Sequence, residues 1–355
     1  MNLLSLFDGI SCARVALDRA GIPVKTYFAS EIDKNAIKVS QARYPDIVRL
    51  GDVRTIHTID AHIDLLIGGS PCVDLSIAKR DRKGLEGERS SLFWEYKRLL
   101  DHCKPTWFIL ENVASMSKAD KDTITRALGV EPVMFDASLV SAQSRKRLFW
   151  TNIKFDLPED KNILLKDILQ PPAEVDESMV VKGKAFCLTA TYAKVSVSEK
   201  QVQNSVERKQ RTLVRTGLNQ VGYVGPINSQ TNRVYSPDGK APTQCKGANG
   251  GAFPTLIKMG HFGNTDSQGS RVYSPEGKSV TLSANGGGGG AKTGMYCFDG
   301  FVRKLTPVEC ERLQGLPDNY TEGIAKTNRY KCLGNAFNVD VVTHILRVPS
   351  LKSSC

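Results

Sequence analysis

Hydrophobic and polar residues alternate along the first 153 residues in two patterns, one typical of short buried strands and the other of amphipathic helices. The strand pattern covers Leu3–Phe7, Val24–Ala29, Leu65–Ile67 and Trp107–Leu110. The helix pattern covers 13–20, 33–44 and a segment that starts after Ser90 or Ser91 and runs to about His102. Because strands and helices follow one another in turn, the pattern predicts an α/β fold with a mostly parallel sheet and helices on both faces.

The pattern changes after about Pro171, where glycine, threonine, serine and short strand-like pieces replace the helical spacing. Residues 222–251 and 260–289 align without a gap at a period of 38 residues, and both contain Arg-Val-Tyr-Ser-Pro-(Asp/Glu)-Gly-Lys. Two copies are too few for a solenoid. We therefore expect two β-hairpin units, with turns at their Ser-Pro-Asp-Gly and Ser-Pro-Glu-Gly segments.

Helical spacing returns after Gly300. Thr306-Pro-Val-Glu309 is a typical helix start, with threonine as the cap, proline in the first position and glutamate in the third. The apolar stretch 337–346 predicts a last helix that packs back on the first domain. The chain is thus expected to divide into segments 1–175, 176–300, 301–329 and 330–355.

Composition and charge narrow the classes of protein to consider. The 355 residues are 41% hydrophobic and 24% charged, as in soluble proteins, and no apolar run approaches the ~20 residues that span a bilayer. The N-terminus lacks the basic region of a signal peptide, which favours an intracellular protein. Nine cysteines without a C-x-x-C pair and five unclustered histidines predict neither disulfides nor a metal site. The net charge of +11, with 15 basic against 8 acidic residues in 176–300, favours a polyanionic partner.

Cys72 follows a short apolar strand and a turn, in the run Asp64-Leu-Leu-Ile-Gly-Gly-Ser-Pro-Cys72. Gly68 and Gly69 let the backbone turn sharply, and Pro71 stiffens the approach to the thiol. The sulfur then lies at the carboxyl end of a strand, where open α/β sheets bind their ligands. This segment alone leaves a buried structural thiol and a nucleophile equally plausible.

Three candidate ligand-binding residues follow other strands. Gly9 lies directly after the first strand, where a glycine permits close approach of a ligand to the backbone. Glu31 follows the second strand, where nucleotide-binding sheets keep an acid for ribose hydroxyls, and Asp52 follows a third. A tight turn and helix-capping acids remain the alternative interpretations of these residues.

A carboxylate and two arginines complete the set of candidates. Glu111 ends an apolar strand, where a carboxylate is costly to bury without a partner. Strand alternation places Arg145 and Arg147 on one face and Lys146 on the other, so two guanidinium groups would converge on an anion such as phosphate. A solvated basic strand is the alternative interpretation.

Taken together, these segments resemble the motifs of the cytosine-C5 DNA methyltransferase family. The residues that carry the resemblance are Phe7-Asp-Gly9, Gly68-Gly-Ser-Pro-Cys72, Glu111-Asn-Val113, Gln143-Ser-Arg145-Lys-Arg147, Arg303-Lys-Leu-Thr306 with Glu309 and Arg312-Leu-Gln-Gly315, and Gly334-Asn335. They stand in the order of the family, and 64–150 is similar to the vertebrate de novo enzymes and some phage enzymes. Two residues depart from the pattern: Ser11 replaces a second glycine found in many relatives, and Ser70 replaces a phenylalanine.

The resemblance implies a Rossmann-like catalytic domain with a smaller, β- and loop-rich target-recognition domain at 176–300. It also implies S-adenosylmethionine as the cofactor, with S-adenosylhomocysteine as its product and no metal. The residues implied to bind this cofactor are Phe7, Asp8, Gly9, Ile10, Ser11, Glu31, Ile32, Asp52, Val53, Leu92, Asn335 and Ala336.

For catalysis the resemblance implies that Cys72 attacks C6 of a flipped-out cytosine, which makes C5 nucleophilic. Glu111 would hold or protonate N3, and Arg147 with Arg145 would hold O2 and the adjoining phosphate. Pro71 and Asn112 would complete the catalytic site. Segment 74–89 is the expected mobile loop over the base. The candidate contacts to double-stranded DNA are Ser76, Gln143, Arg233 and Arg271.

Two other functions compete with DNA methylation at this stage. A tRNA cytosine methyltransferase shares the motifs, although the large basic insert favours duplex DNA. A catalytically silent DNA-binding relative would typically lack the nucleophile or the acid, and Cys72, Glu111 and Arg147 are all present. We expect a monomer in the cytoplasm of a prokaryotic or phage-infected cell, with a cognate restriction enzyme as a candidate partner.

Overall fold

The computed structural model describes residues 1–71, 92–171, 174–175, 220–223, 233–235, 258–261, 271–282, 295–298, 301–348 and 351. Cys72, Ser76, the expected loop 74–89 and the Ser90 and Ser91 caps lie outside these described residues. The chain forms two units. The first consists of 1–163, 281–287 and 307–355, and the second of 164–280 and 288–306.

The first unit is built on a seven-stranded sheet in the order β3-β2-β1-β4-β5-β7-β6. The strands are β1 (Asn2–Leu6), β2 (Thr26–Ser30), β3 (Val48–Gly51), β4 (Leu65–Gly68), β5 (Trp107–Val113), β6 (Val133–Asp136) and β7 (Lys146–Thr151). Pairing is parallel from β3 to β5, and β7 runs antiparallel to both of its neighbours. The mostly parallel sheet predicted from the alternating pattern is confirmed.

The helices of the first half begin and end at residues whose chemistry suits those positions. They are α1 (Cys12–Ala20), α2 (Lys34–Arg43), α3 (Leu92–Cys103) and α4 (Lys118–Leu128), with 3-10 turns at η1 (Val53–Thr55) and η3 (Ala137–Leu139). Gly21 closes α1 in the left-handed conformation, at φ 72°. Asp33 caps α2 by accepting hydrogen bonds from the N–H groups of Asn35 and Ala36, as predicted.

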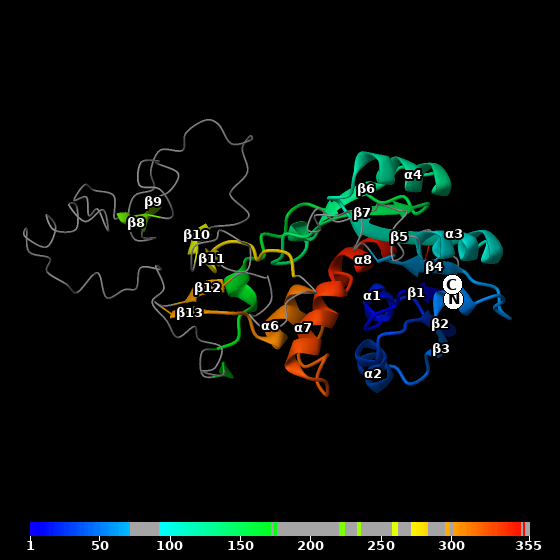
Figure 1. Cartoon of the computed structure of the whole chain (residues 1–355), viewed down its shortest axis with the longest axis horizontal. Coiled ribbons are helices and arrows are strands. Elements are labelled where there is room, and N and C mark those ends of the chain that lie inside the picture. The colour runs from blue at the N-terminus through cyan, green and yellow to red at the C-terminus, as the bar shows by residue number, and fades with distance from the viewer. Residues whose placement is uncertain are drawn as a thin grey trace, which may run out of the picture. The chain divides into compact units, whose positions relative to one another are not determined.

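Helices α3 and α4 share one apolar core with the sheet, on the same side of it (Figure 1). The sheet contributes Leu4, Leu6, Leu66, Phe108, Leu110 and Trp150, and the helices contribute Phe93, Tyr96, Leu99 and Ile124. Burial of each large apolar side chain contributes about 1.5–3 kcal/mol to stability. The Trp150 indole N–H also donates to Thr125 Oγ1 at 2.9 Å, which ties α4 to β7.

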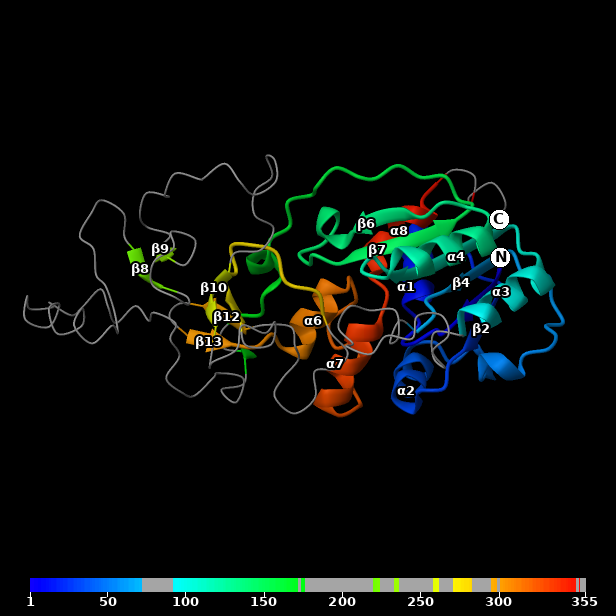
Figure 2. The ribbon, with the colours of Figure 1, turned by 45° about the horizontal axis from the view of Figure 1, so that its top comes forward.

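Three C-terminal helices complete the first unit, and two of them contact its N-terminal helices (Figure 2). They are α6 (Pro307–Leu313), α7 (Lys326–Asn335) and α8 (Val339–Leu346), and α6 begins at the proline predicted for its first position. Asp340 of α8 pairs with Arg19 of α1 at 2.9 Å, and Lys331 of α7 pairs with Asp33 at 2.6 Å. These contacts join α8 to α1 and α7 to the cap of α2.

The second unit contains a four-stranded sheet, β10-β11-β12-β13, and the strand pair β8-β9. These strands are β8 (Gln220–Tyr223), β9 (Arg233–Tyr235), β10 (Lys258–His261), β11 (Arg271–Tyr273), β12 (Met295–Phe298) and β13 (Phe301–Arg303). Gln220 lies opposite Tyr235 in the first repeat, and Lys258 lies opposite Tyr273 in the second. The two repeats therefore form the same antiparallel pair, each with a register shift after its first residue pair.

The boundary between the units lies at residue 163, earlier than the predicted 175. Residues 164–168 bind the second unit: Leu165 N–H donates to Gly277 O at 2.9 Å, and Lys166 pairs with Glu276 at 2.6 Å in the η4 turn (Leu165–Ile168). The predicted hinge segment 301–329 is likewise divided, because the first unit resumes at Pro307. Within the described residues no helix is long and apolar enough to cross a membrane.

Candidate active site

Asn112 of β5 holds the loop that leads to Cys72. Its side-chain N–H₂ donates to Ser70 Oγ at 3.1 Å and to Ser70 O at 3.3 Å, while its Oδ1 accepts from Val113 N–H. Asn112 is 2% exposed, so these bonds form away from competing water. Cys72 itself lies outside the described residues, and the structure places its approach as far as Pro71.

Gly69 lets two side chains come close to this loop. A Cβ at Gly69 would lie 2.7 Å from Cε1 of Phe337 and 3.1 Å from Oε2 of Glu111. The first distance is too short for any side chain. The glycine is therefore needed so that the aromatic ring and the carboxylate can pack directly against the backbone before Pro71.

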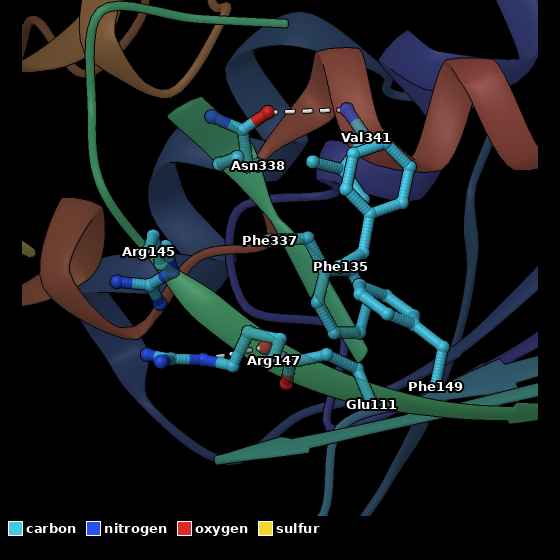
Figure 3. Close-up of a pocket in the computed structure, with 9 residues that line it drawn as sticks. Glu111, Phe135, Arg145, Arg147, Phe149, Phe337, Asn338 and Val341 are labelled. Atoms are coloured by element: carbon cyan, nitrogen blue, oxygen red, sulfur yellow. Dashed lines mark hydrogen bonds and ion pairs between the residues drawn. The ribbon is translucent and has the colours of Figure 1, made fainter. Parts of the chain in front are cut away.

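Glu111 and Arg147 form an ion pair at the carboxyl end of β5. Arg147 Nε lies 2.8 Å from Glu111 Oε1, and the two side chains are 14–15% exposed. They come from paired antiparallel strands, since Val113 lies opposite Arg147. Figure 3 shows this pair in a pocket with the rings of Phe135, Phe149 and Phe337. The pocket thus places a paired carboxylate and guanidinium against apolar walls, an arrangement that suits a flat polar ring.

Arg145 lines the same pocket but does not pair with Glu111. Its guanidinium is 3% exposed and donates to the carbonyl oxygens of Leu282, Gly334 and Ala336 at 3.0–3.2 Å. Arg145 precedes β7, which begins at Lys146, and its planar fork suits several carbonyls at once. The expectation that both arginines converge on an anion is therefore corrected in one respect: three hydrogen bonds of Arg145 are to backbone carbonyls of the chain itself.

The expected DNA contacts lie in different surroundings. Gln143 is completely buried, and its side-chain oxygen and nitrogen have no hydrogen-bond partner among the described residues. This burial does not fit a residue that reads a DNA groove. Arg271 is half-buried in β11, and Arg233 lies at the equivalent position of the other repeat, in β9. Ser76 falls outside the described residues.

Glu31 organises the region expected to bind the cofactor. Its Oε2 accepts from Gly9 N–H at 2.8 Å, and its Oε1 accepts from Ile32 N–H at 2.7 Å and Asp33 N–H at 2.8 Å. Phe7 and Gly9 both have positive φ, at 58° and 60°, and a Cβ at Gly9 would meet no atom within 4 Å. The loop after β1 is thus sharply turned, and open space adjoins its glycine.

The other expected cofactor residues differ in exposure. Ile32 is 66% exposed, which is unusual for a large apolar side chain and suits a platform for a flat ring. Asp52 pairs with Arg54 at 2.5 Å, and the hydrogen bonds from Arg54 lower the pKa of Asp52. The rest divide by exposure: Asp8, Ile10, Ser11, Val53 and Ala336 are buried, Leu92 is half-buried and Asn335 is exposed.

The family profile described as C-5 cytosine-specific DNA methylase matches residues 1–349. The chain belongs to this family. It is 28% identical to the type II methyltransferase M.HhaI of Haemophilus parahaemolyticus over an alignment of 366 residues. That alignment covers 97% of this chain and 93% of the relative. It is 31% identical over 280 residues to the orphan methyltransferase M.SPRI of Bacillus phage SPR, covering 68% of this chain and 63% of the relative.

Two solved structures share the fold. The Entamoeba histolytica methyltransferase EhMeth superposes with a TM-score of 0.60 at 13% identity, covering 98% of this chain and 96% of that chain. The Dnmt2 methyltransferase of S. pombe superposes with a TM-score of 0.56 at 16% identity, covering 98% and 97%. The protein is therefore a DNA (cytosine-5-)-methyltransferase with the Rossmann-like sheet of that family.

Replacing Asn112 by alanine should lower kcat for methyl transfer about a hundredfold, because it releases Ser70 and the approach to Cys72 while the chain still folds. Asn152→Ala is the matched control, since Asn152 accepts from Phe108 N–H at the other end of β5. Initial rates at saturating DNA and cofactor measure both variants. Equal loss of activity in the two would show that Asn112 acts only through general stability.

Phe337 is a pocket residue that motif reasoning did not single out. Its ring contacts the Gly69 backbone position and lines the pocket with Glu111, and it is 8% exposed. The available signal is its place two residues after Asn335 of the last motif, in an otherwise apolar stretch. That stretch was interpreted as a packing helix, although α8 starts two residues later at Val339.

Proposed function

We propose that this enzyme methylates C5 of cytosine within a specific duplex DNA sequence, through a flipped-out base and a covalent bond between Cys72 and C6. The observation that supports it most is the pocket in which Glu111 and Arg147 pair at 2.8 Å, beside the loop that Asn112 and Gly69 hold ahead of Cys72. A nucleophile, an acid and a cation are the groups that this chemistry requires.

In the proposed mechanism the thiolate of Cys72 attacks C6, and electron density moves to C5. Glu111 donates a proton to N3 of the ring, which reduces the negative charge that develops during attack, and takes it back when the Cys72–C6 bond breaks. Arg147, already paired with Glu111, keeps that carboxylate in place and presents its guanidinium to O2 of the base. After methylation a solvent molecule accepts the C5 proton, the C5–C6 double bond re-forms and the Cys72–C6 bond breaks, which restores the thiolate.

The cofactor, when bound, supplies an electrophilic methyl group to C5. We propose that S-adenosylmethionine lies along the turned loop from Phe7 to Ser11, where the space beside Gly9 is open. The carboxylate of Glu31 accepts three backbone hydrogen bonds and retains a lone-pair site for a ribose hydroxyl. Ile32 would pack on the adenine ring, and the exposed Asn335 would lie at the methionine end.

Ile32→Ser should weaken binding of S-adenosylmethionine roughly tenfold, because an exposed apolar platform would no longer cover the adenine ring. The fold should be unaffected, since Ile32 is 66% exposed. Val48→Ser is the matched control: Val48 is 41% exposed and lies on β3 of the same sheet. Isothermal titration measures both, and equal affinities for the two variants would exclude Ile32 from the cofactor site.

The proposed substrate is duplex DNA, and the second unit is the proposed target-recognition region. Segment 176–300 carries 15 basic against 8 acidic residues, which suits phosphate contacts whose strength falls with salt. A cytosine stacked in a duplex cannot be reached by a thiolate, so the base must leave the helix. Arg271 and Arg233, at equivalent positions of the two repeats, are proposed contacts to this DNA.

Methyl transfer from labelled S-adenosylmethionine to duplex DNA and to tRNA, measured side by side, tests the substrate. We expect label in DNA, recovered as 5-methylcytosine, and none in tRNA. Bisulfite sequencing of DNA from cells that express the protein should then show one methylated sequence. Label in tRNA alone would overturn the DNA assignment, and binding of DNA without transfer would indicate a silent relative.

A further inference from the structure

Ser11 adopts a backbone conformation that glycine adopts far more easily. Its φ and ψ are 61° and 39°, in the left-handed region. A residue with a Cβ is strained there. Ser11 is also the residue where many relatives carry a second glycine. In this protein the backbone at residue 11 therefore has a conformation typical of glycine, although the residue is serine.

The hydroxyl of Ser11 does not cap the helix that it precedes. Serine at this position usually accepts a hydrogen bond from the first turn, and α1 has no such side-chain cap. Ser11 Oγ instead donates to Asp8 Oδ2 at 2.5 Å and also hydrogen-bonds with Ser40 Oγ of α2. The side chain is thus directed into the protein, where it is completely buried.

A chain of hydrogen bonds continues from Ser11 across three neighbouring elements. Arg49 of β3 donates to Ser40 Oγ at 2.5 Å, which leaves the Ser40 hydroxyl free to donate to Ser11. Tyr27 of β2 donates to the other oxygen of Asp8, Oδ1, at 2.6 Å. Each hydroxyl between Arg49 and Asp8 can therefore donate once and accept once, so the chain has a single consistent direction.

Asp8, at the end of this chain of hydrogen bonds, is a buried carboxyl group, and burial disfavours its charged form. Burial raises the pKa of Asp8, while hydrogen bonds from Ser11 and Tyr27 and the charge of Arg49, 3.7 Å away, oppose that rise. Both of its oxygens accept a hydrogen bond, Oδ2 from Ser11 and Oδ1 from Tyr27. Asp8 is buried, and its side chain contacts Ser11 in the loop after β1, Tyr27 on β2 and Arg49 on β3, so it ties that loop to the two neighbouring strands.

We propose that the Arg49–Ser40–Ser11–Asp8 chain is a positioning device that holds Ser11 in the left-handed conformation, in place of the missing glycine, and so shapes the cofactor loop. Asp8 and Ser11 are positioning residues, because their side chains are buried and only the loop backbone faces the open space at Gly9. The inference rests on the proposed cofactor site.

The matched variants Ser11→Ala and Ser11→Gly test this inference. Both remove the hydroxyl, and only alanine keeps the Cβ that strains a left-handed backbone. We expect S11A to weaken S-adenosylmethionine binding about tenfold and to raise its KM with kcat unchanged, and S11G to stay within about threefold of the wild type. Asp8→Asn should weaken binding about tenfold alone and less than threefold in the S11G background.

Thermal unfolding without cofactor gives a readout that is independent of the proposed function. S11A should unfold at a lower temperature than S11G. The alanine is strained in the left-handed conformation and lacks the hydroxyl hydrogen bonds that stabilise Ser11 there. The inference is overturned if S11A matches the wild type in both measurements, or if S11G is as weak as S11A. Wild-type protein that does not bind S-adenosylmethionine would instead overturn the cofactor assignment, and the order of unfolding temperatures would still decide the role of Ser11.

Discussion

Cys72→Ser should abolish methyl transfer, with a loss of about a thousandfold or more in kcat, while duplex DNA binding stays within about twofold. Serine keeps the size of the side chain but its hydroxyl is far less acidic than a thiol, so no effective nucleophile reaches C6 at neutral pH. Methyl transfer from labelled cofactor and a DNA-binding titration measure the two effects separately.

Cys103→Ser is the matched control for this prediction. Cys103 lies at the end of α3, is half-buried and forms no disulfide. The control should retain activity within about twofold of the wild type. Methylation that persists in the Cys72 variant would rule out the thiolate mechanism, and loss of DNA binding in it would mean that the substitution disturbs more than the nucleophile.

Glu111→Gln should lower kcat about a hundredfold to a thousandfold and leave cofactor affinity unchanged. The amide has the same shape as the carboxyl group, but it cannot donate a proton to N3 of the ring and it lacks the charge that balances Arg147. Single-turnover rates with saturating DNA measure this loss at the chemical step, and isothermal titration measures the cofactor affinity.

Glu95→Gln is the matched control for Glu111. Glu95 of α3 pairs with Arg98 at 2.7 Å, so this substitution also breaks a Glu–Arg ion pair. It should leave the rate of methyl transfer within about twofold of the wild type. A similar loss of activity in both variants would attribute the effect of Glu111→Gln to general destabilisation.

The sequence was sufficient to predict most of the sheet and the helices that cover it. Strong apolar runs and capping residues such as Asp33 and Gly21 are local signals, and the structure confirms the elements that they mark. Helix α4 and strand β6 were not predicted. Ile124 is the one fully buried residue of α4, and β6 is four residues long, so neither has a clear apolar period.

The site residues that stand at the ends of strands could be predicted from the sequence. Those whose role depends on contacts between residues distant in sequence could not. Glu111 and Arg147 do meet, because the carboxyl end of β5 lies against β7. The role of Arg145 could not be read in the same way, since its carbonyl partners Gly334 and Ala336 lie 189 and 191 residues away. The packing of Phe337 on Gly69 is likewise a tertiary contact without a local signal.

The proposed mechanism requires that Cys72 bonds to C6 of a cytosine while its C5 is methylated. Duplexes of randomised sequence with 5-fluorocytosine in place of cytosine test it most directly, because fluorine at C5 cannot leave as a proton does and the covalent bond should persist. Intact mass spectrometry should show protein joined to DNA with one added methyl group, and peptide mapping should place the bond on Cys72. No adduct, an adduct on another residue, or an equal yield from Cys72→Ser would contradict the mechanism.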